Sequence, residues 1–599
     1  MDLKRLAGRA LATLSLSMLC LVAFAQGRQI TGTVVDGTGE TVIGANVLVV
    51  GTTNGVITDM DGNFTLQDVP TNAKLQISFI GYVPQTISVG NQNHVKVTLK
   101  EDSQALDEVV VIGYGTVKKR DLTGSVASVN NEVLTANPVS NVSQALQGKL
   151  PGVTVISQDG RPGADVSIRV RGGGSITQSN EPLFVVDGFP VSSISDIPAD
   201  QIESIDVLKD ASSTAIYGAR GANGVILVTT KGAKSEKVTV TYNAYIQTKT
   251  VAKTLDALNA QDYVKYTWGY ASALGNSYKE AVEKYFGLGA NYGNKFADYA
   301  NVNAHDYTDD LLHSALSHTH NLSVMGGGEK TKIVFNVNYL NDEGIKINSG
   351  YHRFNTSLKL KQELLKNLSL DLDLRYMEDE TTGKESSTNG KGSILSGAYR
   401  WRAIDNPLGD ASDFSGFLMG ADNVDTAYGS PVAHTNDVQN IANRQNLRAS
   451  AAISWDIIKG LTARSEIGLG RNWSETKYYE DGLTQNYKYA KLTKGNGYNI
   501  RNVTTLNYQV QGLSEIHSLS FLLGNEILIN KSNSSEIIGA GYPDGFDFDQ
   551  TFGMIDQTDK SLAKDAFKNT IGTPKKTVSF FGRANYSLLG RYLLTATFS

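Results

Sequence analysis

The segment that decides the fold runs from Leu368 to Tyr376 and reads Leu-Ser-Leu-Asp-Leu-Asp-Leu-Arg-Tyr. Side chains of a β-strand point alternately to opposite faces, so the leucines share one face and the polar residues share the other. A sandwich would bury the leucines and leave the charges in water. A membrane barrel would place the leucines against lipid and the charges in a wet interior. One strand alone fits both architectures.

The connections between such strands favour the barrel. The segments Ile333–Tyr339 and Leu461–Leu469 show the same alternation, and short connections at 326–329 and 458–460 are interspersed with long ones at 250–316 and 378–443. Short turns at one end and long loops at the other are typical of outer-membrane barrels. We count about eleven strands. They begin near Val238, Asn321, Thr331, Arg353, Leu368, Asn446, Leu461, Arg501, Ser518, Val578 and Tyr592.

The amino terminus has the pattern of a secretory signal. The basic residues Lys4, Arg5 and Arg9 precede the apolar stretch Leu11–Phe24, which ends in an Ala-x-Ala cleavage site at Ala25. The stretch is too short to span a bilayer well, and no run of 18 apolar residues follows it. We therefore predict export from the cytoplasm and no helical membrane span.

Residues 26–101 read as an all-β sandwich, because short β-rich runs such as Thr31–Val35 and Val95–Leu99 are separated by turn clusters. A linker follows at 102–119. It contains four consecutive β-branched residues, Val109–Ile112, with polar and glycine-rich flanks and no adjacent hairpin partner. Such a strand can add to a sheet edge of another protein. On spacing alone, an ordinary edge strand fits equally well.

Several motifs in different parts of the chain share one resemblance. Residues 26–101 are similar to the carboxypeptidase-regulatory-like domain, and three further motifs are Ile168–Gly172, Leu183–Gly188 and Ile202–Ile226. The linker contains Asp107, Glu108, Val109, Val110, Val111, Ile112, Gly113 and Tyr114. Together these segments resemble the SusC/RagA-type TonB-linked outer-membrane transporters, in which the three motifs correspond to plug motifs and the linker segment to the TonB box.

This resemblance implies a mainly β fold in three parts: an all-β sandwich, an α/β plug and an antiparallel transmembrane β-barrel. Plugged transporters have about 22 strands, so eleven correspond to the first half of a barrel and the chain to an amino-terminal fragment. The expected domains are a signal peptide at 1–25, a sandwich at 26–101, a linker with the TonB box at 102–119, a plug at 120–232 and a partial barrel at 233–599.

Three arginines of the expected plug are candidate latch residues. Arg169, Arg171 and Arg220 would need carboxylates or water around them, because an unpaired buried charge is costly. Pairs with the barrel wall would hold the plug and release it under force. The sequence does not name the wall partners.

Other kinds of site are disfavoured. The glycines of the expected plug match neither the phosphate-binding pattern G-x-x-x-x-G-K-S/T nor the dinucleotide-binding pattern G-x-G-x-x-G. No Gly-x-Ser-x-Gly elbow, which would carry a nucleophilic serine, occurs. His318 and His320 share a strand face without an evident third ligand, so an interfacial position is favoured over a metal site. The only cysteine, Cys20, lies in the signal. A net charge of −5 offers no basic surface for nucleic acid. We expect no catalytic residue, metal or cofactor, and therefore no enzyme.

The function that the resemblance implies is TonB-dependent import of a nutrient across the outer membrane. The expected partners are the periplasmic domain of TonB, a SusD/RagB-like surface lipoprotein, the nutrient (an oligosaccharide or a peptide) and outer-membrane lipid. The alternatives are a signal-transducing receptor and a surface adhesin barrel. Aromatic residues of the long loops, such as Tyr266, Trp268 and Tyr270, could stack on sugars but more simply belong to loop packing or an interfacial belt.

Overall fold

The computed structural model describes most of the chain after residue 27. It describes residues 28–599 except 38, 53, 71, 80–81, 91, 101–108, 113–114, 119–125, 138, 158–159, 165, 178, 234–236, 384–397, 400–403, 405–430, 483–486, 515, 560 and 563–565. The chain forms two compact units, and the division between them falls within residues 110–123. The expected signal peptide lies outside the described residues.

The first unit is the predicted β-sandwich. A three-stranded sheet has the order β4-β1-β7, and a four-stranded sheet has the order β3-β2-β5-β6. Ile30, Val47, Leu75 and Val97 are among the alternate apolar residues that fill the space between the sheets. The strands are β1 Arg28–Val35, β2 Asn46–Val49, β3 Gly55–Ile57, β4 Asn63–Val69, β5 Lys74–Ser78, β6 Gln85–Ser88 and β7 His94–Thr98.

The second unit begins with a mixed α/β plug. Its five-stranded sheet has the order β10-β15-β16-β13-β14, and β11 and β12 form a separate hairpin. The strands are β10 Val126–Asn130, β11 Val153–Ser157, β12 Val166–Val170, β13 Leu183–Val186, β14 Phe189–Val191, β15 Ile202–Leu208 and β16 Val225–Thr230. The helical turns are α2 Asn131–Thr135, α3 Val142–Ala145, η3 Ala199–Gln201, α4 Ala211–Thr214 and η4 Ala215–Gly221.

Asp210 and Gly218 mark two points of the helical segment between β15 and β16. Asp210 is the N-cap of α4, although its side chain makes no capping hydrogen bond. Gly218 interrupts the helix with φ 57° and ψ −144°, a conformation that a Cβ disfavours, but a further helical turn continues to Gly221.

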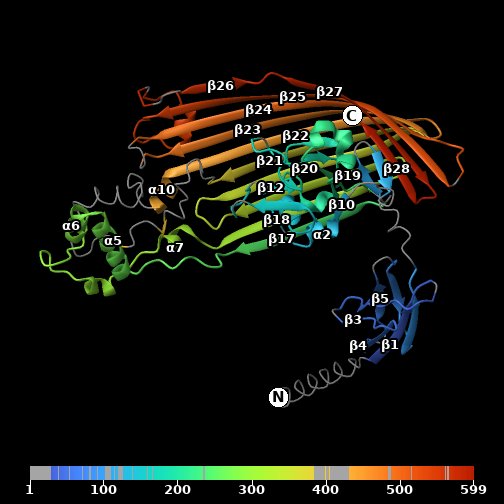
Figure 1. The fold of residues 1–599 in the computed structure, drawn as a ribbon, viewed down its shortest axis with the longest axis horizontal. Helices are drawn as coiled ribbons and strands as arrows, with labels where there is room; N and C mark the ends of the chain where they lie inside the picture. Colours follow the sequence, from blue (N-terminus) through green and yellow to red (C-terminus); the bar gives the residue numbers. More distant parts are fainter. Residues whose placement is uncertain are drawn as a thin grey trace, which may run out of the picture. The chain divides into compact units, whose positions relative to one another are not determined.

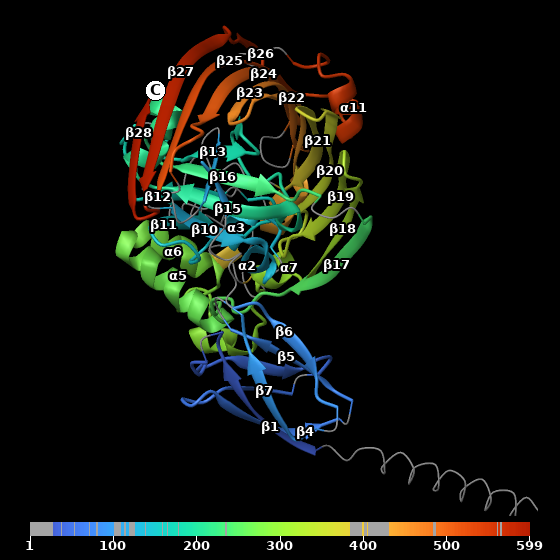
Figure 2. The same ribbon diagram turned by 90° about the vertical axis from the view of Figure 1, so that its right-hand side faces the viewer.

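The rest of the second unit is a curved antiparallel sheet of twelve strands that surrounds one side of the plug (Figures 1 and 2). Eleven strands follow one another in chain order and correspond to the eleven predicted. They are β17 Thr239–Lys249, β18 Ala315–Gly327, β19 Thr331–Glu343, β20 Gly350–Leu365, β21 Leu368–Thr382, β22 Val438–Ile458, β23 Leu461–Glu480, β24 Tyr489–Gln509, β25 His517–Ala540, β27 Lys575–Leu588 and β28 Tyr592–Phe598.

The strands differ from the prediction in length and in one addition. The strands β22 and β24 begin well before the predicted Asn446 and Arg501, and each has 21 residues. About 9–11 residues suffice to cross a bilayer, so these strands extend beyond it. The short strand β26, Phe567–Ile571, pairs with the outer half of β25 and was not predicted.

The curved sheet β17–β28, called the wall below, has a polar face toward the plug and an apolar face away from it. On β20, Arg353 and Asn355 are only 4% and 5% exposed, while the alternate residues Phe354 and Leu358 are 39% and 41% exposed. A sandwich would show the reverse arrangement. The structure therefore confirms the barrel interpretation of the alternating segments.

Short connections gather at one end of the sheet. Those at 328–330 and 459–460 are short, as predicted, and those at 366–367 and 589–591 are short as well. At the other end the connection at 344–349 is also short, whereas that at 250–314 is long. A helical connection joins β17 to β18. It contains α5 Ala260–Leu274, α6 Asn276–Tyr285, η5 Phe296–Asn301 and α7 Tyr307–Leu311. Two more short helices are α10 Pro431–Asp437 and α11 Phe548–Gly553. No helix among the described residues is both long and apolar enough to cross a bilayer.

Candidate functional site at the plug–barrel interface

The first contact between plug and wall is made by Arg220 of η4. Its guanidinium pairs with the carboxylate of Glu526 on β25. Glu526 also accepts a hydrogen bond of 2.7 Å from Nε of Arg501 on β24, and Arg501 lies 3.2 Å from Glu466 on β23. The side chains of Glu526 and Arg501 are 1% and 3% exposed. Charges of alternating sign thus run from the plug across three wall strands.

The other two predicted arginines do not lie at such contacts. Arg171 pairs with Asp210 at 2.7 Å, and both residues belong to the plug. Arg169 lies on β12 with an exposed side chain. Within the part of the chain that the structure describes, Arg220 is the one latch candidate that meets a carboxylate of the wall. The latch role itself stays a prediction.

A second contact was not predicted and centres on Asp187, which directly follows β13. Its carboxylate lies 2.9 Å from Nζ of Lys359 on β20 and pairs with the guanidinium of Arg375 on β21. Within the plug it accepts hydrogen bonds from the backbone N–H of Thr230, at 3.0 Å, and from its hydroxyl, at 2.8 Å. Arg375 also pairs with Asp373 at 2.8 Å.

The charge of Asp187 is strongly favoured at this position. Burial would raise the pKa of its carboxyl, but the cations of Lys359 and Arg375 and the N–H of Thr230 outweigh burial and hold the pKa well below its usual value. The sequence carried part of this signal, because Arg375 and Asp373 lie on the polar face of the segment that decides the fold. It did not indicate which plug residue would meet them.

A third contact involves the plug segment between β14 and η3. Nη1 of Arg353 donates a hydrogen bond of 2.6 Å to the backbone oxygen of Ser195, and the amide of Asn446 donates one of 2.9 Å to Asp196. Burial raises the pKa of Asp196, an effect that Asp379 increases and the neighbouring arginines reduce. In contrast to Asp187, the surroundings of Asp196 therefore disfavour the charged form of its carboxyl.

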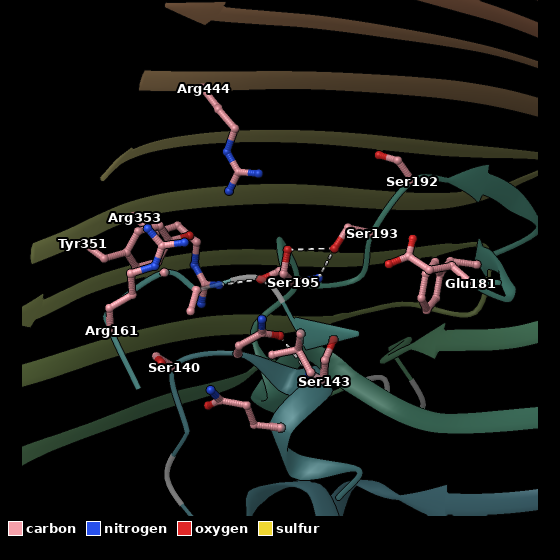
Figure 3. Close-up of a pocket in the computed structure, with 16 residues that line it drawn as sticks. Ser140, Ser143, Arg161, Glu181, Ser192, Ser193, Ser195, Tyr351, Arg353 and Arg444 are labelled. Atoms are coloured by element: carbon pink, nitrogen blue, oxygen red, sulfur yellow. Dashed lines mark hydrogen bonds between the residues drawn. The ribbon is translucent and has the colours of Figure 1, made fainter. Parts of the chain in front are cut away.

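A cavity of about 320 Å³ adjoins this third contact and lies between plug and wall (Figure 3). Arg161, Ser193 and Ser195 line it from the plug, and Tyr351, Arg353 and Arg444 line it from the wall. Tyr351 and Arg353 stand at the start of β20, and Arg444 stands near the start of β22. Both strand starts lie opposite the short connections 366–367 and 459–460, so the cavity lies in the other half of the wall.

The segment predicted to meet TonB is described only in part. Val109–Ile112 forms strand β8, and Gly115–Lys118 forms strand β9; the two make a two-stranded sheet. The expectation that no hairpin partner is adjacent was therefore wrong, because β9 follows directly. Asp107, Glu108, Gly113 and Tyr114 lie outside the described residues.

The histidines and loop aromatics are placed mainly in packing roles. His320 contacts the hydroxyl of Tyr242 at 2.7 Å on the apolar side of the wall. Among the residues that the structure describes, no three His, Asp or Glu residues are grouped to hold a metal ion. Trp268 packs in the helical connection and donates a hydrogen bond of 3.0 Å to Glu283, whereas Tyr266 and Tyr270 stack on the exposed side of α5.

Comparison with known proteins gives two domain matches. Residues 30–111 match the CarboxypepD_reg-like domain, and residues 118–225 match the TonB-dependent Receptor Plug Domain. The first match covers the sandwich from within β1 and extends into β8. The second covers the plug up to the start of β16.

Relatives match over nearly the whole chain. The TonB-dependent receptor SusC of Bacteroides thetaiotaomicron is 34% identical over 97% of this chain and 57% of its own length. The TonB-dependent receptor P3 of Formosa agariphila is 32% identical over 96% of this chain and 54% of its own length. This chain thus spans about half the length of the curated relatives it matches. The RagAB peptide importer in its open-open state has the same fold, with a TM-score of 0.64 and 23% identity over 82% of this chain and 56% of that one.

Proposed function

We propose that the chain is a SusC/RagA-type TonB-dependent receptor of the outer membrane and that it imports a nutrient actively across that membrane. The proposed substrate is an oligosaccharide or a peptide, and the proposed lid is a SusD/RagB-like surface lipoprotein. SusC and the RagAB peptide importer, which the chain resembles, support this assignment. The chain would supply passage and gating, with no reaction of its own.

The sidedness of the sheet supports a division of labour between its two ends. The plug joins the sheet at the start of β17, and the short connections lie at that same end of the sheet. This is the periplasmic end in barrels of this kind. TonB would meet the chain there through Asp107–Tyr114. Strand β8 offers a backbone edge for strand addition, in which main-chain hydrogen bonds provide the affinity. The proposed domain boundaries follow residue 25 after the signal peptide, residue 101 after the sandwich, residue 119 after the linker and residue 232 after the plug.

The observation that carries the proposal is the way in which wall charges are compensated. If Asp187 is pulled away, Arg375 keeps its pair with Asp373; if Arg220 is pulled away, Glu526 keeps Arg501. Leaving a buried charge without any partner costs about 3–5 kcal/mol. Because the wall retains internal partners, plug release avoids most of that cost and is reversible. These contacts suit a latch that holds at rest and opens under a pull.

The test uses the full-length receptor in cells. We expect Val110→Pro to abolish uptake, because proline removes the N–H that strand addition to TonB requires. The matched control Val110→Ala keeps that N–H and should import normally. Substrate binding at the cell surface should be equal in both variants.

The alternatives predict other outcomes. If the chain is a surface adhesin, the unaltered protein should import nothing, and Val110→Pro should leave its adhesion unchanged. A receptor that only signals would lose gene induction without any measurable import by the unaltered protein. Normal import by Val110→Pro would contradict the proposed role of this strand.

A further inference from the structure

The cavity between plug and wall has a chemical character of its own. Guanidinium groups of Arg161, Arg353 and Arg444 line it, together with hydroxyls that include those of Ser193 and Ser195. Figure 3 shows Arg444 reaching from β22 toward the group formed by Arg353 and Arg161, with Glu181 on the opposite side. Arginine side chains from two parts of the chain thus converge on one space, while Glu181, the acidic residue of the lining, lies apart from them.

The arginines of the wall are held in place by partners that leave donors available. Nε and Nη2 of Arg444 bind the two carboxylate oxygens of Asp379 at 3.0 and 2.5 Å, while the arginine side chain remains 42% exposed. Arg353 donates from Nη1 to Ser195. A guanidinium has five N–H donors, so each arginine keeps donors for a ligand. Fixed donors lose little conformational entropy when they bind.

The plug side of the cavity is equally well defined. A Cβ on Gly163 would lie 2.5 Å from the ring of Tyr351, so the loop that carries Arg161 is seated directly against the wall. The hydroxyls of Ser193 and Ser195 lie 2.8 Å apart, and the backbone N–H of Ser195 donates to Ser193. A ligand in the cavity would therefore contact plug and wall together.

We propose that this cavity binds a carboxylate group of the substrate. A planar carboxylate matches the paired N–H groups of a guanidinium, and charge-assisted bonds of this kind are about twice as strong as neutral ones. The inference rests on the proposed import of an oligosaccharide or peptide. Either class can supply the group, through a uronic acid sugar or through the carboxyl end of a peptide.

The test measures binding to the purified full-length receptor by calorimetry with two matched probe pairs. One pair is trigalacturonic acid and its neutral methyl ester. The other is a mixture of short peptides with free carboxyl ends and the same mixture with amidated ends. We expect the acidic member of one pair to bind at least about tenfold more tightly than its neutral counterpart, as one charge-assisted hydrogen bond implies. The pair that discriminates identifies the source of the carboxylate.

Two variants locate the effect. Arg161→Gln should weaken binding of the acidic probe about tenfold or more and leave the neutral one unchanged, and Arg161→Lys should restore part of the loss. The control Arg169→Gln removes the same charge from the exposed surface of β12 and should change nothing. Thermal unfolding of each variant checks that the fold is intact.

Two results would overturn the proposal. In the first, both acidic probes bind no better than their neutral counterparts. In the second, Arg169→Gln weakens binding as much as Arg161→Gln does. Failure of the import function is recognised separately, because Val110→Pro changes uptake while the binding measured here is independent of TonB.

Discussion

Replacing Asp187 by Asn removes the charge at the centre of the second plug–wall contact. Among the described residues, Lys359 would keep Asp373 as its carboxylate, at 3.8 Å, and Arg375 would keep Asp373 at 2.8 Å. Removing one partner of a fully buried ion pair costs about 3–5 kcal/mol, and an exposed pair contributes about 0–1 kcal/mol. The side chains here are 13–23% exposed and Arg375 keeps a partner, so we expect a loss of about 2 kcal/mol.

This loss should appear as local opening of the plug. A free energy of about 2 kcal/mol corresponds to a roughly 30-fold larger population of the opened state. Hydrogen exchange of the full-length receptor would report it at the backbone N–H of Asp187, which donates to Val228, and at that of Thr230. The exposed Glu132 provides the control Glu132→Gln, for which exchange should be unchanged.

The pH dependence follows from the sign of the pKa shift. Because the folded protein lowers the pKa of Asp187, its contribution is fully present above the unfolded value of about 4 and is lost as the pH falls toward the lowered pKa. Protection of these amides should therefore decrease in acid for the unaltered protein and stay flat for Asp187→Asn. Equal protection of both proteins at neutral pH would refute the assignment of Asp187 as a latch.

Three further predictions concern the plug contacts and the wall. Arg220→Gln should destabilise the seated plug by about 1 kcal/mol, a small loss because Glu526 keeps Arg501, and should therefore increase proteolysis of the plug in the full-length receptor several-fold. Arg169→Gln should leave proteolysis unchanged; equal effects of the two variants would contradict the special position of Arg220. Asp196→Asn should raise the thermal stability of the receptor at neutral pH and not in acid, because burial raises the pKa of Asp196 and thus opposes its charge as the pH rises; a loss of stability at neutral pH would show that the charge is required. Spin labels at Leu372 should contact lipid and labels at Asp371 should contact water, as paramagnetic relaxation agents can measure; equal wetness would exclude a membrane-facing side.

The sequence determined the local structure of most elements, because each follows from periodicity over a few residues. Alternation in segments such as Leu368–Tyr376 identified the strands and the face that each turns to lipid. Turn residues and short connections fixed the order of neighbours, since antiparallel strands joined by a tight turn pair directly. The helical connection at Ala260–Tyr285 and the strand β26 escaped this reasoning, because both lie inside connections that were treated as loops.

The plug–wall contacts were decided by the tertiary structure alone. Arg220 and Glu526 are 306 residues apart in the chain, and Asp187 and Arg375 are 188 apart. The alternation of polar and apolar residues indicates which side chains face inward. The level along the barrel axis at which such a side chain meets the plug depends on strand stagger and on how the plug is seated. Those quantities are set by many weak contacts distributed over the whole unit. The sequence therefore supplied the arginines and carboxylates of these contacts, and only the packed fold determined which of them meet.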